Sequence, residues 1–134
     1  MAEVTTRTPR ETMEARFDRI LAGEFPIDLY AEDVEVENPL SPEGERRHIH
    51  GRDALVKGFA GMMSGSTIKA IKDLTIQETT DPELIVSEFK VDIEIKESMK
   101  TYQLVFVMIT RVRDGLIVST RDYSNSAWAR AGAN

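Results

Sequence analysis

Leu84 to Asp122 reads LIVSEFKVDIEIKESMKTYQLVFVMITRVRDGLIVSTRD. Apolar side chains recur at every second position and β-branched and aromatic residues dominate, which predicts strands over 84–96, 101–113 and 116–122. Glu97-Ser98 and Asp114-Gly115 supply the turns, so these strands are expected to form an antiparallel meander. A strand over 67–78, followed by a turn at Asp81-Pro82, extends the same pattern toward the N-terminus.

Helical patterns precede these strands. Thr8, Pro9 and Glu11 form a capping pattern, and an apolar stripe from Met13 to Leu21 predicts an amphipathic helix that stops at Gly23. The spacing predicts a short helix over 26–30, a strand over 34–38 that ends before a proline, and a helix from 51 to a stop at 64–66.

Helices first and a meander afterwards predict one α+β domain over 1–134, with a frayed start over 1–7, in which a curved sheet forms a cup and carries its helices on one face. Leu104 to Ile109 is apolar on both faces, so both faces of that strand are expected to be covered, one by the helices and the other by a second subunit. The pattern thus predicts a homodimer.

Composition excludes several classes of function. The 134 residues carry 17 basic and 23 acidic side chains, a net charge of -6, which disfavours nucleic acid and anionic membranes as partners. The chain has no cysteine, which rules out thiol nucleophiles and disulfide frameworks. Without a signal-peptide or membrane-spanning pattern, we expect a cytoplasmic protein that binds a hydrophobic small molecule.

Two carboxylates stand out on the strands. Lys90 and Asp92 share one face of their strand, which is either a solvated surface or part of the cup wall. Asp122 shares a face with Thr120 and Ser124; it either pairs at the surface or points into the cup. Asn38 precedes Pro39 and is either a turn residue or an amide that presents itself to the cup.

His48 and His50 form a pair that would face the same way on a strand, but no third ligand is fixed nearby, so no metal site is predicted.

Several motifs resemble the SnoaL-like, or nuclear transport factor 2-like, superfamily, and most closely limonene epoxide hydrolase. The similar stretches are Leu29 to Val34, Glu37 to Leu40, Gly51 to Leu55, Lys90 to Asp92, Lys100 to Leu104, Asp114-Gly115 and Arg121 to Tyr123. The resemblance implies a conical α+β barrel, usually dimeric, with a curved, mostly antiparallel sheet, N-terminal helices on its concave face and a deep apolar pocket.

The resemblance also implies roles. Asp92 would protonate an epoxide oxygen, and Asp122 with Asn38 would activate water. Lys90 stands where the family has an arginine between the two carboxylates, and Val36 stands where it has a tyrosine that helps to hold the water. The ketosteroid isomerase pattern does not match: Asn38 replaces its general base, and Ile109 replaces its oxyanion-hole aspartate.

These roles predict a cofactor-independent acid-base enzyme that opens an epoxide of a terpenoid- or polyketide-like molecule, by hydrolysis or by cyclisation, and needs no metal. The alternatives are a SnoaL-type polyketide cyclase or isomerase and a non-catalytic binding or dimerisation domain. The residues expected to line the substrate pocket are Phe17, Tyr30, Val36, Leu55, Phe59, Leu104, Phe106 and Thr120, with Trp128 as a further packing candidate.

Overall fold

The computed structural model describes residues 6–41 and 47–125. In chain order the elements are α1 (Pro9–Leu21), the 3-10 turn η1 (Ile27–Leu29), β1 (Tyr30–Glu37), β2 (His48–His50), α2 (Arg52–Gly65), β3 (Ser66–Glu78), β4 (Leu84–Ile95), β5 (Thr101–Arg113) and β6 (Leu116–Ser124). The predicted α+β fold is confirmed, and most element bounds agree with the sequence pattern to within a few residues.

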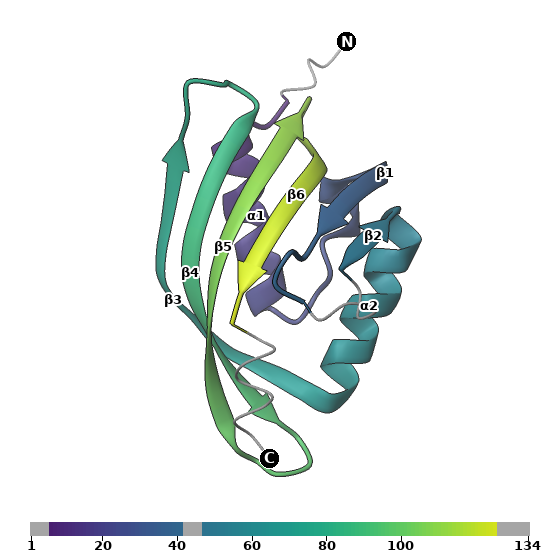
Figure 1. Ribbon diagram of the computed structural model, residues 1–134, viewed down its shortest axis with the longest axis vertical. Coiled ribbons are helices and arrows are strands. Elements are labelled where there is room, and N and C mark those ends of the chain that lie inside the picture. The colour runs from purple at the N-terminus through teal and green to yellow at the C-terminus, as the bar shows by residue number, and fades with distance from the viewer. Residues whose placement is uncertain (1–5, 42–46, 126–134) are drawn as a thin grey trace.

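The strands form one sheet in the order β2-β1-β6-β5-β4-β3. All neighbours are antiparallel except β1 and β6, which run parallel. Figure 1 shows the sheet as a strongly twisted, curved surface with α1 behind β4, β5 and β6, and with α2 along the side near β1 and β2. The local patterns did not reveal this parallel pairing, because it joins strands that lie far apart in the sequence.

The predicted helix start is confirmed in detail. The Thr8 hydroxyl accepts a hydrogen bond from the Glu11 backbone N–H, and the Glu11 carboxylate accepts one from the Thr8 backbone N–H. This reciprocal capping satisfies donors that the first turn of a helix leaves unpaired. At the β5–β6 turn, Asp114 and Gly115 both have positive φ, as a tight two-residue hairpin requires.

The core lies between α1 and the concave face of the sheet. Phe89 of β4 packs edge-on against Phe17 of α1, with ring centroids 4.7 Å apart, and stacks on Phe106 of β5 at 5.1 Å. Met13 and Leu29 are fully buried beside them. This packing fixes α1 against β4 and β5 and so sets one wall of the cavity described below.

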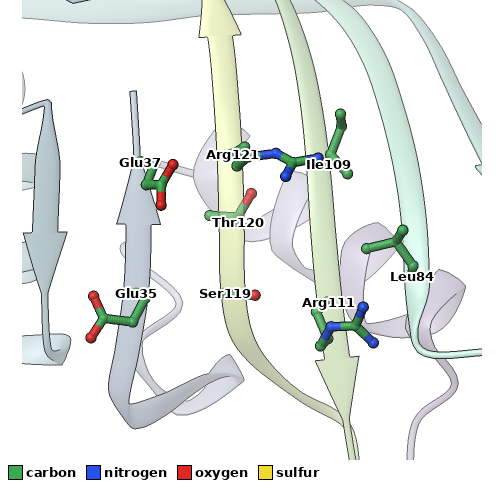
Figure 2. Close-up of a pocket in the computed structure, with 8 residues that line it drawn as sticks. All are labelled: Glu35, Glu37, Leu84, Ile109, Arg111, Ser119, Thr120 and Arg121. Atoms are coloured by element: carbon green, nitrogen blue, oxygen red, sulfur yellow. The ribbon is translucent and has the colours of Figure 1, made fainter. Parts of the chain in front are cut away.

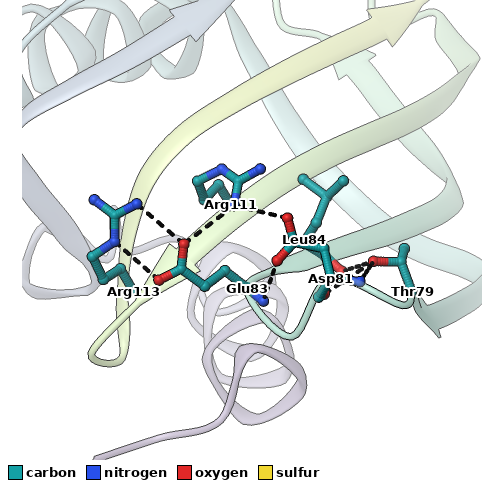
Figure 3. Close-up of polar contacts among 6 residues, drawn as sticks. All are labelled: Thr79, Asp81, Glu83, Leu84, Arg111 and Arg113. Atoms are coloured by element: carbon teal, nitrogen blue, oxygen red, sulfur yellow. Dashed lines mark hydrogen bonds and ion pairs between the residues drawn. The ribbon is translucent and has the colours of Figure 1, made fainter.

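Charged side chains fasten the β3–β4 turn to β5. Arg111 contacts Asp81 at 3.1 Å and Glu83 at 3.2 Å, and Arg113 donates two hydrogen bonds to the Glu83 carboxylate (Figure 3). The Thr79 hydroxyl bonds within the same turn, to the Leu84 carbonyl. This cluster lies at the opposite end of the long strands from the β4–β5 turn, and it holds the register of the β4–β5 pair.

No helix within the described residues combines the length and the apolar character needed to cross a membrane.

Candidate functional site

A cavity of about 460 Å³ opens between the concave face of the sheet, α1 and α2. Its walls are mainly apolar, with side chains from every layer of the fold: Phe25, Val36, Ile49, Leu55, Phe59, Met62, Ile93, Ile95, Leu104 and Phe106. Polar groups also reach it, and among the described lining residues Arg16 is the one basic residue and Asp122 the one acidic residue. An apolar chamber with few convergent polar groups is typical of a small-molecule site.

Asp122 reaches the cavity from β6, at the end of a chain of hydroxyl groups. The Thr120 hydroxyl donates to Asp122 Oδ1 at 2.6 Å, and the Thr110 and Thr120 hydroxyls are 3.0 Å apart. Since Thr120 has one hydrogen and gives it to an ionised Asp122, Thr110 must then donate to Thr120. When Asp122 is protonated the direction of the chain can reverse, so the site accommodates either protonation state.

Burial raises the pKa of Asp122 above its ordinary value, because few waters solvate its charge. The hydrogen bond from Thr120 and the positive charge of Arg16 act in the opposite direction. Asp122 is half-buried, and since it lines the cavity, its remaining surface is open to a bound molecule. A carboxyl of raised pKa facing an apolar chamber is suited to accept and return protons.

Arg16 and Tyr30 form a second polar pair at the cavity. Arg16 Nε donates to the Tyr30 hydroxyl oxygen at 2.7 Å, which leaves the hydroxyl hydrogen of Tyr30 available to another acceptor. Phe25 stacks on the Tyr30 ring with centroids 5.3 Å apart and fixes its orientation. Burial opposes the charge on Arg16, but Tyr30 and Asp122 offset it, so that the pKa of Arg16 lies above its ordinary value.

Most of the predicted pocket residues line this cavity. Those that do are Tyr30, Val36, Asn38, Leu55, Phe59, Leu104, Phe106, Thr120 and Asp122. Phe17 was expected to line the pocket, but it lies outside the cavity lining. It is 3% exposed and packs between α1 and β4, because its ring fills the core against Phe89. Trp128 lies outside the described residues.

The positions of Lys90 and Asp92 also differ from the catalytic roles expected for them. They lie on the convex face of the sheet, because Phe89, Val91 and Ile93 on the alternating positions turn inward. Asp92 pairs with Lys72 at 2.6 Å and accepts a hydrogen bond from Gln103 at 3.1 Å. The hydrogen bond from Lys72 holds the pKa of Asp92 below its usual range. The structure therefore does not bring Asp92 and Asp122 into one cavity.

Lys90 likewise pairs outside the cavity, with Asp73 at 3.2 Å.

Arg16 is the charged residue that the sequence analysis missed. It lies three residues after Met13 and four before Ile20, at the edge of the apolar stripe of α1. A charged residue bordering the buried face of an amphipathic helix was the available signal. Tyr102 and Ser66, which also line the cavity, offered no comparable signal.

A second, smaller hollow of about 250 Å³ lies on the opposite face of the sheet. Figure 2 shows its lining, in which the Arg121 side chain extends toward Ile109 while the Glu35 carboxylate points away from the other residues. Glu35 is instead held by His48 and His50 of β2. Within the described part of the chain, no group of three or more acidic or histidine side chains is arranged to hold a metal ion.

The SnoaL-like domain model matches residues 10–120. A curated Bacillus subtilis (strain 168) protein, "Uncharacterized protein YesE", is 26% identical over 98 residues, which cover 73% of this chain and 67% of that protein. Among solved structures, "Putative Isomerase" from Bacillus subtilis superposes with a TM-score of 0.84 at 24% identity, covering 92% of this chain and 93% of that one. A "putative polyketide cyclase" from Xanthomonas campestris pv. campestris reaches 0.77 at 20% identity, over 91% and 94%.

Proposed function

Since this chain belongs to the SnoaL-like domain family, we propose that it is a cofactor-independent acid-base enzyme that cyclises or isomerises a hydrophobic carbonyl compound, with Asp122 as the proton carrier. The observation that carries the proposal is the position of Asp122: it is the one carboxylate among the described residues that line the apolar cavity, and burial raises its pKa.

The chemistry follows from the groups that face the cavity. Ionised Asp122 takes a proton from a carbon beside the substrate carbonyl, and the electron pair moves onto the carbonyl oxygen. Tyr30 donates its hydroxyl hydrogen to that oxygen, and Arg16 behind it stabilises the negative charge that develops. The enolate then either takes the proton back at another carbon, which is isomerisation, or attacks a second carbonyl, which is cyclisation.

In both outcomes the protons balance. After isomerisation, Asp122 has returned its proton to carbon and is ionised again. After cyclisation, it gives the proton to the new alkoxide oxygen. Neither route consumes water or an oxidant, which agrees with an apolar chamber. The names carried by the structural neighbours, an isomerase and a polyketide cyclase, support this choice of reaction class.

Deuterium exchange tests the proton-transfer step without knowledge of the natural substrate. In D₂O, the purified protein is expected to accelerate exchange of the acidic ring protons of 2-tetralone, followed by NMR. Asp122→Asn should reduce the protein-dependent rate by about 10²–10⁴-fold, the usual contribution of a positioned base. Asp92→Asn is the matched control, because Asp92 lies on the convex face, and it should retain the rate.

Two results would count against this proposal. Equal rates for Asp122→Asn and the unmodified protein would remove Asp122 from the chemistry. No exchange on any of a panel of ring ketones that measurably bind would favour the non-catalytic binding alternative.

Epoxide opening is the second candidate, supported by the fact that Asn38 and Asp122 both line the cavity. Asp122 would remove a proton from water or from a substrate hydroxyl, and the Tyr30 hydroxyl, instead of Asp92, would protonate the epoxide oxygen. Diol formation from limonene oxide, measured by gas chromatography and lost in Asp122→Asn, would select this candidate over the first.

A further inference from the structure

Arg16 holds unused hydrogen-bond donors at the cavity. Its Nε donates to Tyr30, and its guanidinium carbon lies 5.2 Å from the centroid of the Phe17 ring. Among the described residues, the hydrogens on Nη1 and Nη2 have no hydrogen-bond acceptor. Asp122 acts on Arg16 through its charge alone, since the two side chains form no ion pair within 4.0 Å.

A guanidinium whose donors lack hydrogen-bond partners beside an apolar chamber raises the free energy of the folded protein, unless water or a ligand solvates it. Water can form these hydrogen bonds in a cavity that is open to solvent, and a hydrophobic substrate that displaces such water must replace its hydrogen bonds. A substrate that binds well must therefore bring an acceptor to Arg16.

The single cation of the described lining favours an anionic acceptor. Arg16 and Asp122 are the charged side chains among the described lining residues, and Asp122 acts on Arg16 through its charge without occupying the Nη hydrogens. A planar guanidinium pairs best with a planar anion that presents two oxygens side by side. A phosphate dianion would place more negative charge in the chamber than this single cation offsets.

We propose that the substrate carries a carboxylate, and that the Nη1 and Nη2 hydrogens of Arg16 bind it while the apolar body of the molecule fills the chamber between Phe59 and Leu104. This inference deepens the proposed function and rests on it: the carboxylate would orient the carbonyl toward Tyr30 and the neighbouring carbon toward Asp122. The added negative charge would also raise the pKa of Asp122 further in the complex, which strengthens it as a base.

Paired probes of equal shape test this proposal. Isothermal titration calorimetry at pH 7 and low salt compares 1-naphthoate with neutral 1-naphthamide on the intact protein. The carboxylate should bind at least about tenfold more tightly, as a charge-assisted hydrogen bond predicts. Arg16→Gln should abolish this preference while leaving the affinity for the amide within a few fold.

Two further variants control the measurement. Arg121→Gln makes the same substitution on the convex face of the sheet, and it should preserve the preference for naphthoate. Arg16→Lys keeps the charge without the planar fork, so it should keep part of the preference, and it serves as the test if Arg16→Gln fails to fold. Far-UV circular dichroism and a thermal melt establish folding for each variant.

Equal binding of naphthoate and naphthamide by the unmodified protein would overturn the proposal, as would a preference that survives in folded Arg16→Gln or is lost equally in Arg121→Gln. Asp122→Asn separates this failure from failure of the proposed function. It should stop deuterium exchange yet bind naphthoate at least as well, since it removes the negative charge that competes for Arg16. Exchange that persists in Asp122→Asn would refute the acid-base role of Asp122, but it would not contradict the proposed carboxylate-binding site at Arg16.

Discussion

Replacing Thr120 by valine should destabilise the protein through a different residue, Thr110. Thr120 is 3% exposed and Thr110 is fully buried, and their hydroxyls bond to each other at 3.0 Å across β5 and β6. Valine matches threonine in shape, so Thr120→Val leaves the packing intact but strands the Thr110 hydroxyl without its partner. An unsatisfied buried hydroxyl costs about 1–3 kcal/mol, which lowers the melting temperature by roughly 4–12 °C for a chain of this size.

The double variant Thr110→Val with Thr120→Val removes both hydroxyls and should recover the part of this loss that comes from Thr110, since no buried hydroxyl is then left unpaired. The hydrogen bond to Asp122 is absent from Thr120→Val and from the double variant alike, so it does not affect this comparison. Chemical denaturation of the unmodified protein, both single variants and the double variant gives the coupling free energy. The reasoning fails if the double variant is as unstable as Thr120→Val, because the cost then lies elsewhere in the site.

The same variants carry a second signal. Thr120 donates to Asp122 and thereby holds down the pKa of that carboxyl, so its loss raises the pKa of Asp122 further. The acidic limb of the pH–rate profile for deuterium exchange should move to higher pH in both Thr120→Val and the double variant. Thr110→Val alone leaves the bond to Asp122 in place and should leave that limb where it is.

Three further predictions concern the core, the turn network and the cavity. Phe89→Ala should cost about 3–5 kcal/mol by chemical denaturation, because Phe89 packs against Phe17 in the centre of the core. Glu83→Gln should lower the melting temperature at pH 7, and this effect should shrink as pH falls below about 4 and vanish once the folded carboxylate is protonated, because hydrogen bonds from Arg113 hold the pKa of Glu83 below its ordinary value. Asp122→Asn should gain stability relative to the unmodified protein as pH rises from about 4 to 7, because a raised pKa costs stability wherever the unfolded chain ionises first.

Each of these has a matched control. Val105→Ala removes an exposed side chain from the convex face and should change stability by less than about 0.5 kcal/mol. Glu88→Gln removes an exposed carboxylate outside the turn network. Its melting temperature should equal that of the unmodified protein both at pH 7 and at acidic pH. Asp92→Asn should lose stability relative to the unmodified protein as pH rises toward about 4, opposite in sign to Asp122→Asn, because Lys72 lowers the pKa of Asp92 and the ionised carboxylate then stabilises the fold. Parallel trends in the two asparagine variants would contradict the assigned environments.

Local patterns were sufficient for most of the elements, although they did not predict β2. The capping residues Thr8 and Glu11 predicted the start of α1, and the turn at Asp114-Gly115 predicted the hairpin that the structure has. Both are interactions between residues close in sequence, so the chain encodes them without reference to the rest of the fold. The pairing of β1 with β6 was not predictable in this way, because nothing local links two strands separated by most of the chain.

For the candidate site as well, local patterns predicted some features and the tertiary structure decided the others. Alternation alone placed Thr120, Asp122 and Ser124 on one face of β6, and the structure has all three lining the cavity. Alternation also placed Lys90 with Asp92, but it could not say which face of β4 turns inward. The packing of Phe89 against α1 decided that, and it put the charged face outside.

By itself, then, the sequence determined both α-helices, most of the strands and the grouping of side chains on those strands, since backbone geometry and neighbouring residues fix these features. Only the tertiary structure decided which groups share the cavity. It joined Arg16 from α1 and Tyr30 from β1 to Asp122 from β6, and it excluded Asp92. The physical reason is that burying the largest apolar area orients every element at once, and the direction in which a polar side chain then points is a consequence of the whole core.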